Sequence, residues 1–253
     1  MRCLLVILSV ILFLSETPDH RSPIRPRIPV ICYHGIYIRH GKEGSALVIG
    51  RDQLDAQLKS LYDSGYHTIS PDQLCDYLTK AAPLPLKPVL ITFDDTRAEH
   101  FAIAAPLLEQ YGFKGVFFVM TVPIGKPGYM TANAIKSLSD SGHVIGAHTW
   151  DHPYLNRSGA WNYTVQVARP KQLLEQITGK PVVYFAYPFG EWNETTIDML
   201  RKGGFRAAFQ LAGRLSEKYP QYTIQRMMVD GRWSGLRLQQ EMNRIFTGAN
   251  HLR

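Results

Sequence analysis

Apolar residues along this chain gather in short runs that alternate with stretches of helical spacing. The runs predict buried strands at Val30–Tyr33, Val89–Phe93, Gly115–Met120, Val144–Ala147, Val182–Tyr187, Phe205–Leu211 and Thr223–Val229. Apolar residues three or four positions apart predict a helix around residues 54–61 and further helices at Pro71–Leu78, Ala98–Tyr111, Thr131–Ser141, Trp161–Thr178, Glu194–Lys202 and Leu236–Phe246. This alternation favours a mostly parallel sheet with outer helices, and we expect a closed or nearly closed (β/α) barrel.

Two short polar segments follow predicted strands. Residues 92–95 read Thr-Phe-Asp-Asp, and residues 148–152 read His-Thr-Trp-Asp-His. Barrel enzymes build their active sites at the carboxyl ends of the strands. Asp95, His148 and His152 form a ligand set suited to a catalytic zinc or similar divalent ion, because three protein ligands leave one position open for water. Asp94 then remains free to act as a base.

The aspartate pair and the histidine pair each also have an ordinary structural explanation. Asp94 and Asp95 would point to opposite faces of a regular strand, and an isolated pair of this kind commonly forms a turn or caps the next helix. Two histidines four residues apart also occur without a metal, and Pro153 favours a loop at His152. The two pairs together favour a metal site, since a turn at the strand end can bring both carboxylates to one place.

A third segment, Tyr-Pro-Phe-Gly at residues 187–190, lies at the end of another predicted strand. In this order the three segments resemble the first three motifs of the polysaccharide deacetylases, carbohydrate esterase family 4, which share the NodB-homology domain. The resemblance covers roughly Val30 to Phe246. It implies a single-domain distorted (β/α) barrel and the metal-dependent removal of acetyl groups from N-acetylated sugar polymers.

The resemblance also implies roles for particular residues. Asp94 would be the catalytic base, and Asp95, His148 and His152 would hold one divalent metal, with zinc expected and cobalt or nickel as alternatives. Such an ion lowers the pKa of water and polarises the acetyl carbonyl. The backbone N–H near Phe189 would help to hold the oxyanion.

An early segment, Cys-Tyr-His-Gly at residues 32–35, supplies a candidate acid. It is similar to the Tyr-His segment of the subgroup that deacetylates exported poly-N-acetylglucosamine. That segment replaces the late Leu-x-His of the wider family, of which this chain has no convincing copy. The resemblance therefore implies that His34 is the general acid. The alternative is a histidine that closes the first strand through a backbone hydrogen bond.

Two positions depart from the family pattern. Thr96 stands where glycine usually follows the Asp-Asp pair, which puts the geometry of that turn in question. Ala186 stands where the third motif usually begins with an arginine that pairs with the base. Arg226, on the last predicted strand, could take the place of that arginine, and so could Arg206.

Aromatic residues near the motifs are candidates to stack on sugar rings. They are Trp150, Tyr154, Tyr187 and Trp192. We expect about half of them to be ordinary packing residues.

Composition and charge narrow the class of partner. A chain of 253 residues fits a single barrel domain. The net charge of +7 is spread along the sequence, apart from a basic cluster at residues 20–27. Nucleic-acid binding would need lysine and arginine concentrated on one element, so we expect no nucleic-acid partner, and the charge favours at most a mild attraction to anionic envelope polymers. The sequence identifies no protein partner.

The amino terminus predicts export. A short basic start leads into an apolar run from Leu4 to Leu14. This length suits a signal peptide and falls short of the roughly 20 residues of a spanning helix. We therefore expect residues 1–20 to be a signal peptide or an uncleaved N-terminal membrane anchor, with an N-terminal strand as the structural alternative. Residues 21–29 read as a proline-rich linker and 30–253 as the catalytic domain, which places the protein in the periplasm, in the cell envelope or outside the cell.

The sequence thus predicts a hydrolase that removes N-acetyl groups from a polysaccharide or oligosaccharide containing N-acetylglucosamine. The same metal chemistry would serve an O-acetyl esterase or another amide hydrolase. A non-catalytic carbohydrate-binding relative is a further alternative, supported only by Thr96 and Ala186.

Overall fold

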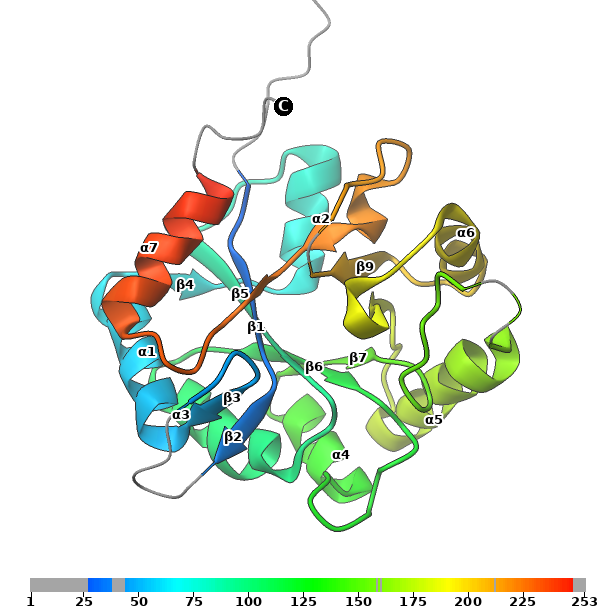
Figure 1. Cartoon of the computed structure of the whole chain (residues 1–253), viewed down its shortest axis with the longest axis horizontal. Helices are drawn as coiled ribbons and strands as arrows, with labels where there is room; N and C mark the ends of the chain where they lie inside the picture. Colours follow the sequence, from blue (N-terminus) through cyan, green and yellow to red (C-terminus); the bar gives the residue numbers. More distant parts are fainter. Residues whose placement is uncertain (1–26, 38–43, 158, 160, 212, 248–253) are drawn as a thin grey trace, which may run out of the picture.

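The fold is a nearly closed barrel of parallel strands with helices packed around it (Figure 1). The computed structural model describes residues 27–37, 44–157, 159, 161–211 and 213–247. The predicted signal peptide or anchor, and the linker up to residue 26, lie outside the described residues. Within the described part of the chain, no helix is long and apolar enough to cross a membrane.

One parallel sheet forms the barrel. Its strands run in the order β10-β9-β8-β7-β6-β5-β1-β11, with β4 added beside β5. Their bounds are β1 Val30–Tyr33, β4 His67–Thr68, β5 Pro88–Asp94, β6 Gly115–Val119, β7 Val144–Ala147, β8 Tyr184–Ala186, β9 Ala207–Gln210, β10 Ile224–Gln225 and β11 Met227–Met228. The short strands β2 (Gly35–Tyr37) and β3 (Val48–Gly50) form a separate parallel pair, which the sequence did not predict.

The segment that closes the barrel is broken at one residue. We predicted a single strand at Thr223–Val229, but the structure divides it into β10, which pairs with β9, and β11, which pairs with β1. These two strands are consecutive in the chain and lie at opposite ends of the sheet order. Arg226 stands alone between them and therefore lies at the seam of the barrel.

Helices cover the outside of the barrel, and α7 packs against α1 (Figure 1). Their bounds are α1 Arg51–Asp63, α2 Pro71–Lys80, α3 Ala105–Gln110, α4 Ala132–Asp140, α5 Arg169–Thr178, α6 Glu194–Lys202 and α7 Gly235–Phe246. Four of them begin at residues whose side-chain oxygens accept a backbone N–H of the first turn, which is the usual N-cap bond. These residues are Ser70, Thr131, Asn193 and Ser234.

Two predicted helices begin as wider π-helical turns. These turns, His100–Ala104 and Thr164–Ala168, run directly into α3 and α5. In both cases proline is the second residue of the following helix, at Pro106 and Pro170. Proline lacks an N–H and its ring crowds the carbonyl four residues earlier, so a wider turn accommodates it. Such turns are frequent at functional sites, and His100 lies in the first of them.

Alternation along the strands separates the barrel interior from the helix-covered side. Phe118 on β6 contacts Phe209 on β9 at 5.2 Å between ring centroids, although β7 and β8 lie between these strands in the sheet, so both rings point inward. On β5, Thr92 and Asp94 share the inner face, and Phe93 joins the outer core. The interior is thus apolar at one end and polar where the strands terminate.

Close packing at Gly146 of β7 gives a test of this interior. A Cβ there would lie 2.4 Å from Cδ1 of Phe118 and 3.1 Å from the Tyr184 carbonyl oxygen. We expect Gly146→Ala to lower the free energy of unfolding by about 1–3 kcal/mol, measured by urea denaturation. Gly35→Ala is the control, because its Cβ would meet Val48 at an ordinary 3.4 Å. Equal stability of the two variants would contradict this packing.

Candidate active site at the carboxyl end of the barrel

A left-handed turn brings two adjacent carboxylates to one place. Asp94 ends β5, and the next residues, Asp95 and Thr96, have φ angles of +80° and +62°. Because the chain reverses there, both side chains reach the same histidine. The Nε2 atom of His148 lies 4.0 Å from Oδ2 of Asp94 and 3.7 Å from Oδ1 of Asp95.

Thr96 adopts the conformation for which the family normally uses glycine. A left-handed conformation at a β-branched residue costs on the order of 1–3 kcal/mol and persists only when its surroundings hold it. Here the Thr96 hydroxyl donates to the Met120 carbonyl at 2.8 Å, and the Thr96 carbonyl accepts the Met130 N–H at 2.9 Å. The turn therefore forms despite the departure from the family pattern.

The two histidines converge across a tight loop. His148 directly follows β7, and Thr149 and His152 both have left-handed backbones, with φ angles of +65° and +68°. The His152 N–H donates to the Thr149 hydroxyl at 3.0 Å, which closes the loop. Nε2 of His152 consequently lies 3.8 Å from Oδ1 of Asp95.

Asp95, His148 and His152 fit a single divalent ion. Ligand bonds of about 2.0–2.2 Å in a tetrahedral site put two ligand atoms roughly 3.4 Å apart. The observed separations of 3.7 and 3.8 Å from Asp95 to the two histidines are close to this value. Nδ1 of His148 donates to the Ala186 carbonyl at 2.8 Å, which leaves Nε2 free to accept. Burial, with the nearby His148, lowers the pKa of His152 to about 4, so that its ring is neutral at pH 7.

A buried arginine holds the second carboxylate. Nη1 and Nη2 of Arg226 each donate to one oxygen of Asp94 at 2.7 Å, and Nη1 also contacts the Thr92 hydroxyl at 3.3 Å. Burial alone would raise the pKa of Asp94. The charge and hydrogen bonds of Arg226, aided by His148 and His34, instead hold that pKa well below its ordinary value. Asp94 is therefore ionised at neutral pH.

Arg226 reaches Asp94 from the seam between β10 and β11, where its own N–H donates to the Gln210 carbonyl at 3.0 Å. Its guanidinium lies 5.3 Å from the centre of the Phe118 ring, inside the barrel. Ala186 on β8 is fully buried. Position 186 on β8 therefore has no arginine to pair with Asp94, and Arg226 from the closing segment makes that contact instead.

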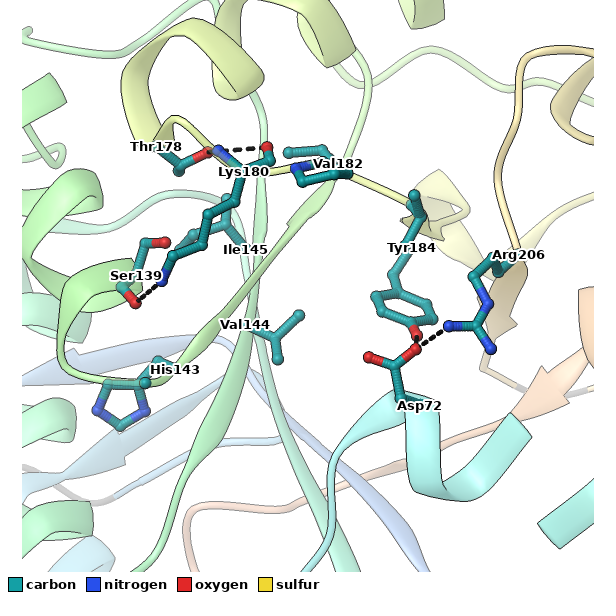
Figure 2. Close-up of a pocket in the computed structure, with 13 residues that line it drawn as sticks. Asp72, Ser139, His143, Val144, Ile145, Thr178, Lys180, Val182, Tyr184 and Arg206 are labelled. Carbon is teal, nitrogen blue, oxygen red and sulfur yellow. Dashed lines mark hydrogen bonds and ion pairs between the residues drawn. The ribbon is translucent and has the colours of Figure 1, made fainter. Parts of the chain in front are cut away.

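The prediction that Arg206 could contact Asp94 is wrong. Arg206 precedes β9 and lies at the amino end of the strand, where it pairs with Asp72 and Asp76 of α2. Asp72 also accepts a hydrogen bond from the Tyr184 hydroxyl, as Figure 2 shows. Asp72, Tyr184 and Arg206 line a cavity of about 530 Å³ beside the first residues of β7 and β8, at the end of the barrel opposite Asp94 and Asp95.

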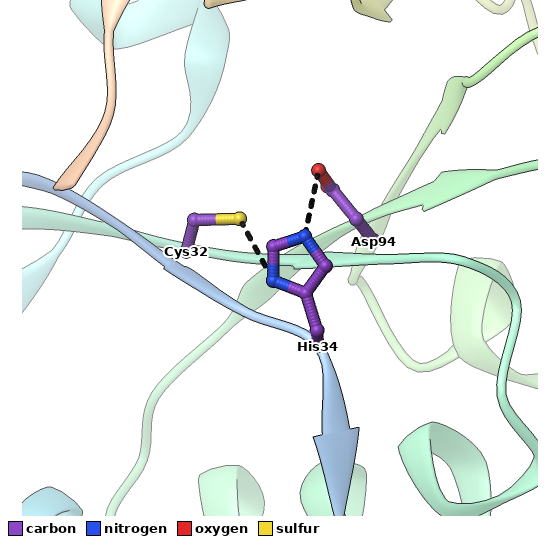
Figure 3. A group of neighbouring side chains, drawn as sticks. All are labelled: Cys32, His34 and Asp94. Carbon is purple, nitrogen blue, oxygen red and sulfur yellow. Dashed lines mark hydrogen bonds and ion pairs between the residues drawn. The ribbon is translucent and has the colours of Figure 1, made fainter. Parts of the chain in front are cut away.

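His34 lies between Cys32 and Asp94 (Figure 3). Its Nε2 is 3.9 Å from Oδ2 of Asp94, and its Nδ1 is 3.9 Å from Sγ of Cys32. Burial outweighs the opposing charges of Asp94 and Asp95, and the pKa of His34 therefore lies below its ordinary value. Its side chain keeps 15% exposure, so solvent or a ligand can reach it.

The sequence assigned no role in the site to Cys32. It is buried and free, as is Cys75, and burial raises the pKa of its thiol. Its sulfur also lines the site beside His34. Alternation would have indicated this, since residues 32 and 34 share one face of an extended chain.

Only part of the predicted aromatic set is available to a ligand. Tyr187 is fully buried among the outer core residues, so the prediction that it could stack on a sugar is wrong. Trp192 is half-buried and donates its indole N–H to Gln210 at 2.8 Å. Trp150 remains 41% exposed and Phe189 45% exposed.

Phe189 is a partly exposed residue in contact with His152. Its backbone is left-handed, with a φ angle of +59°. Its ring meets the His152 ring at 4.4 Å in an edge contact and stacks on Tyr154 at 3.9 Å. The guanidinium of Arg157 lies 4.1 Å from the centre of the Tyr154 ring. This stack fixes an exposed aromatic face directly beside His152.

Known proteins share both sequence and fold with this chain. It is 29% identical to YxkH of Bacillus subtilis, which is named as a polysaccharide deacetylase, over 83% of this chain and 74% of YxkH. It is 28% identical to a peptidoglycan-N-acetylglucosamine deacetylase of Bacillus cereus, over 46% of this chain and 42% of the relative. That second match thus spans less than half of the relative's length.

Solved structures of deacetylases share the fold of this chain. The deacetylase PplD of Streptococcus pyogenes superposes with a TM-score of 0.78 at 24% identity, over 86% of this chain and 99% of PplD. IcaB of Ammonifex degensii superposes with a TM-score of 0.68 at 28% identity, over 81% and 92%. The family model described as polysaccharide deacetylase matches residues 81–208. That match spans the Asp-Asp, His-x-x-x-His and Tyr-Pro-Phe-Gly segments, and the chain belongs to the polysaccharide deacetylase family.

Proposed function

We propose that this enzyme removes N-acetyl groups from a polysaccharide containing N-acetylglucosamine and releases acetate. The observation that carries the proposal is the convergence of three groups at one strand end. The group of Asp95, His148 and His152 lies beside Asp94, His34 lies 3.9 Å from the same carboxylate, and Arg226 holds Asp94 in place. A base, an acid and a place for a divalent ion are what amide hydrolysis requires.

Asp95, His148 and His152 would hold the ion, and zinc is the metal that this donor set suits best. When bound, a divalent ion of this kind lowers the pKa of water and polarises a carbonyl group. The Arg226 clamp keeps Asp94 ionised and aimed into the site, so that it can accept a proton from the attacking water. His34 then donates a proton to the departing amine, and the acetyl C–N bond breaks to give acetate and a free amino sugar.

The backbone at Phe189 would assist. The Phe189 ring contacts the His152 ring, which places Phe189 next to the proposed ligand set, and its backbone N–H would hold the oxyanion that forms on the acetyl carbonyl. The exposed rings of Phe189 and Trp150 offer apolar faces against which a sugar ring can pack.

His34 favours an amide substrate over an acetate ester. An amine is a poor leaving group until it is protonated, whereas a sugar hydroxyl leaves with less help. A proton donor 3.9 Å from the base supports N-deacetylation as the principal reaction. O-acetyl ester hydrolysis on the same metal site is the second candidate.

The apolar run at residues 4–14 supports export of this enzyme to the cell envelope or beyond. An N-acetylated envelope polymer would be encountered there. Residues 30–253 would then form the catalytic domain.

The metal requirement is directly testable. We expect one zinc per chain by elemental analysis, loss of acetate release after chelation, and recovery on adding zinc or cobalt. His148→Ala should weaken zinc binding by at least about tenfold, because it removes a ligand. The exposed His67 provides the control, since His67→Ala should keep full zinc content. Undiminished acetate release by chelated, metal-free protein would contradict the assignment.

The base is tested by a substitution that keeps its shape. Asp94→Asn should lower kcat for acetate release by roughly 10²–10⁴-fold, because the amide cannot accept the proton. Zinc content should be unchanged. Asp151→Asn is the control: Asp151 lies in the loop after β7 and accepts a hydrogen bond from Gln166, and its loss should leave the rate close to that of the parent. Full acetate release by Asp94→Asn would reject Asp94 as the base.

The arginine clamp is tested through stability. Arg226→Met leaves the Asp94 carboxylate buried without its partner, so we expect a loss of about 3–5 kcal/mol in the free energy of unfolding. Adding Asp94→Asn should recover part of that loss. Arg206→Met is the matched control, because its ion pair with Asp72 is about half exposed and should contribute about 1 kcal/mol or less. Equal losses in the two single variants would show that the clamp is not a special contact.

A further inference from the structure

His100 is a buried histidine to which the proposed chemistry assigns no role. It lies in the π-helical turn that precedes α3 and is 1% exposed. Its Nε2 lies 2.6 Å from the backbone carbonyl oxygen of His34, a residue 66 positions earlier in the chain. A carbonyl oxygen only accepts, so Nε2 of His100 carries the proton and donates it. Burial lowers the pKa of His100 to about 4, so the ring stays neutral at pH 7.

This bond is one of two hydrogen bonds that hold the peptide unit between His34 and Gly35. The His34 carbonyl and the Gly35 N–H belong to the same planar unit. The carbonyl accepts from His100, and the N–H donates to the Leu47 carbonyl at 2.9 Å. On the other side of His34, Tyr33 is paired in register with Phe93 of β5. Both flanks of the His34 α-carbon are thus fixed, which sets the direction of its side chain.

The His100 ring is itself anchored next to the base. It packs against Phe93 at 5.4 Å and against Phe117 at 6.2 Å between ring centroids. Phe93 immediately precedes Asp94 and stacks on Phe117 at 5.0 Å. One side chain therefore contacts both the strand that carries Asp94 and the peptide that carries His34. Those two groups must stay about as close as their observed 3.9 Å if both act on one substrate.

We propose that His100 is a positioning residue for the general acid. Its Nε2–H bond to the His34 carbonyl holds the His34 imidazole beside Asp94, where it can reach the departing amine. The inference rests on the proposed function, because it assigns His34 as the proton donor. A purely structural histidine would contribute stability alone, and its loss would affect every substrate equally.

The test compares two substitutions of nearly equal shape. His100→Gln keeps an N–H donor at a similar distance from the backbone, and His100→Met replaces it with a group that cannot donate. Two substrates separate the roles: an N-acetylglucosamine oligomer, whose amine must be protonated to leave, and 4-nitrophenyl acetate, whose leaving group departs unprotonated. We expect His100→Met to lower kcat on the oligomer by roughly 10–100-fold, since a displacement of about 1 Å can cost about 10²-fold.

For the same variant, KM for the oligomer and kcat for the aryl ester should stay within a few-fold of the parent enzyme, and His100→Gln should regain most of the lost oligomer rate. His100→Phe supplies a second donor-free variant should His100→Met not fold. Equal losses on both substrates, or no loss on either, would overturn the proposal.

His34→Ala, assayed in parallel, distinguishes the role of His34 as the acid from the role of His100 in positioning it. If it slows the oligomer selectively and His100→Met does not, the positioning role fails and the proposed function stands. If His34→Ala itself shows no selectivity for the oligomer, the assignment of the acid fails, and the role of His100 fails with it.

Discussion

The buried pairing of Arg226 with Asp94 is the contact around which this site is organised. A carboxylate with almost no exposure is stable only when another charge and its hydrogen bonds replace the lost water. Arg226 supplies both through two 2.7 Å bonds and therefore keeps Asp94 ionised next to the three prospective metal ligands. Without this arginine, burial would favour the protonated acid, and the group could no longer accept a proton. Arg226 of the last strand segment thus makes the contact that the family resemblance assigned to an arginine at position 186.

Much of this arrangement could be predicted from the sequence because it follows from regular periodicities. The apolar runs identified seven barrel strand segments, and the motifs at their ends indicated where the site would lie. The choice between Arg226 and Arg206 could also have been made. Arg206 precedes its strand and so belongs to the amino end of the barrel. Alternation likewise places Tyr187 with Phe185, on the side that faces the helices, and explains its burial.

The remaining features depend on contacts that no local pattern encodes. Nothing near His100 indicates a bond to a carbonyl 66 residues away, because the contact arises only when β1 and the first turn before α3 meet. The left-handed turn at Asp95 and Thr96 is similar. Threonine disfavours that conformation, and it is held by hydrogen bonds to Met120 and Met130, which come from the next loop. The sequence did not predict the π-helical turns, because a proline near the beginning of a helix normally lies in its first turn. Here a π-helical turn precedes each of these prolines.

The seam of the barrel links catalytic competence to completion of the fold. Asp94 and the three prospective metal ligands all precede residue 153, but the partner of Asp94 is 132 residues further along the chain and comes from the segment that joins β9 to β1. A chain in which this segment has not docked lacks the two hydrogen bonds that orient the buried Asp94 carboxylate. The contact that keeps Asp94 ionised therefore exists only in the closed barrel.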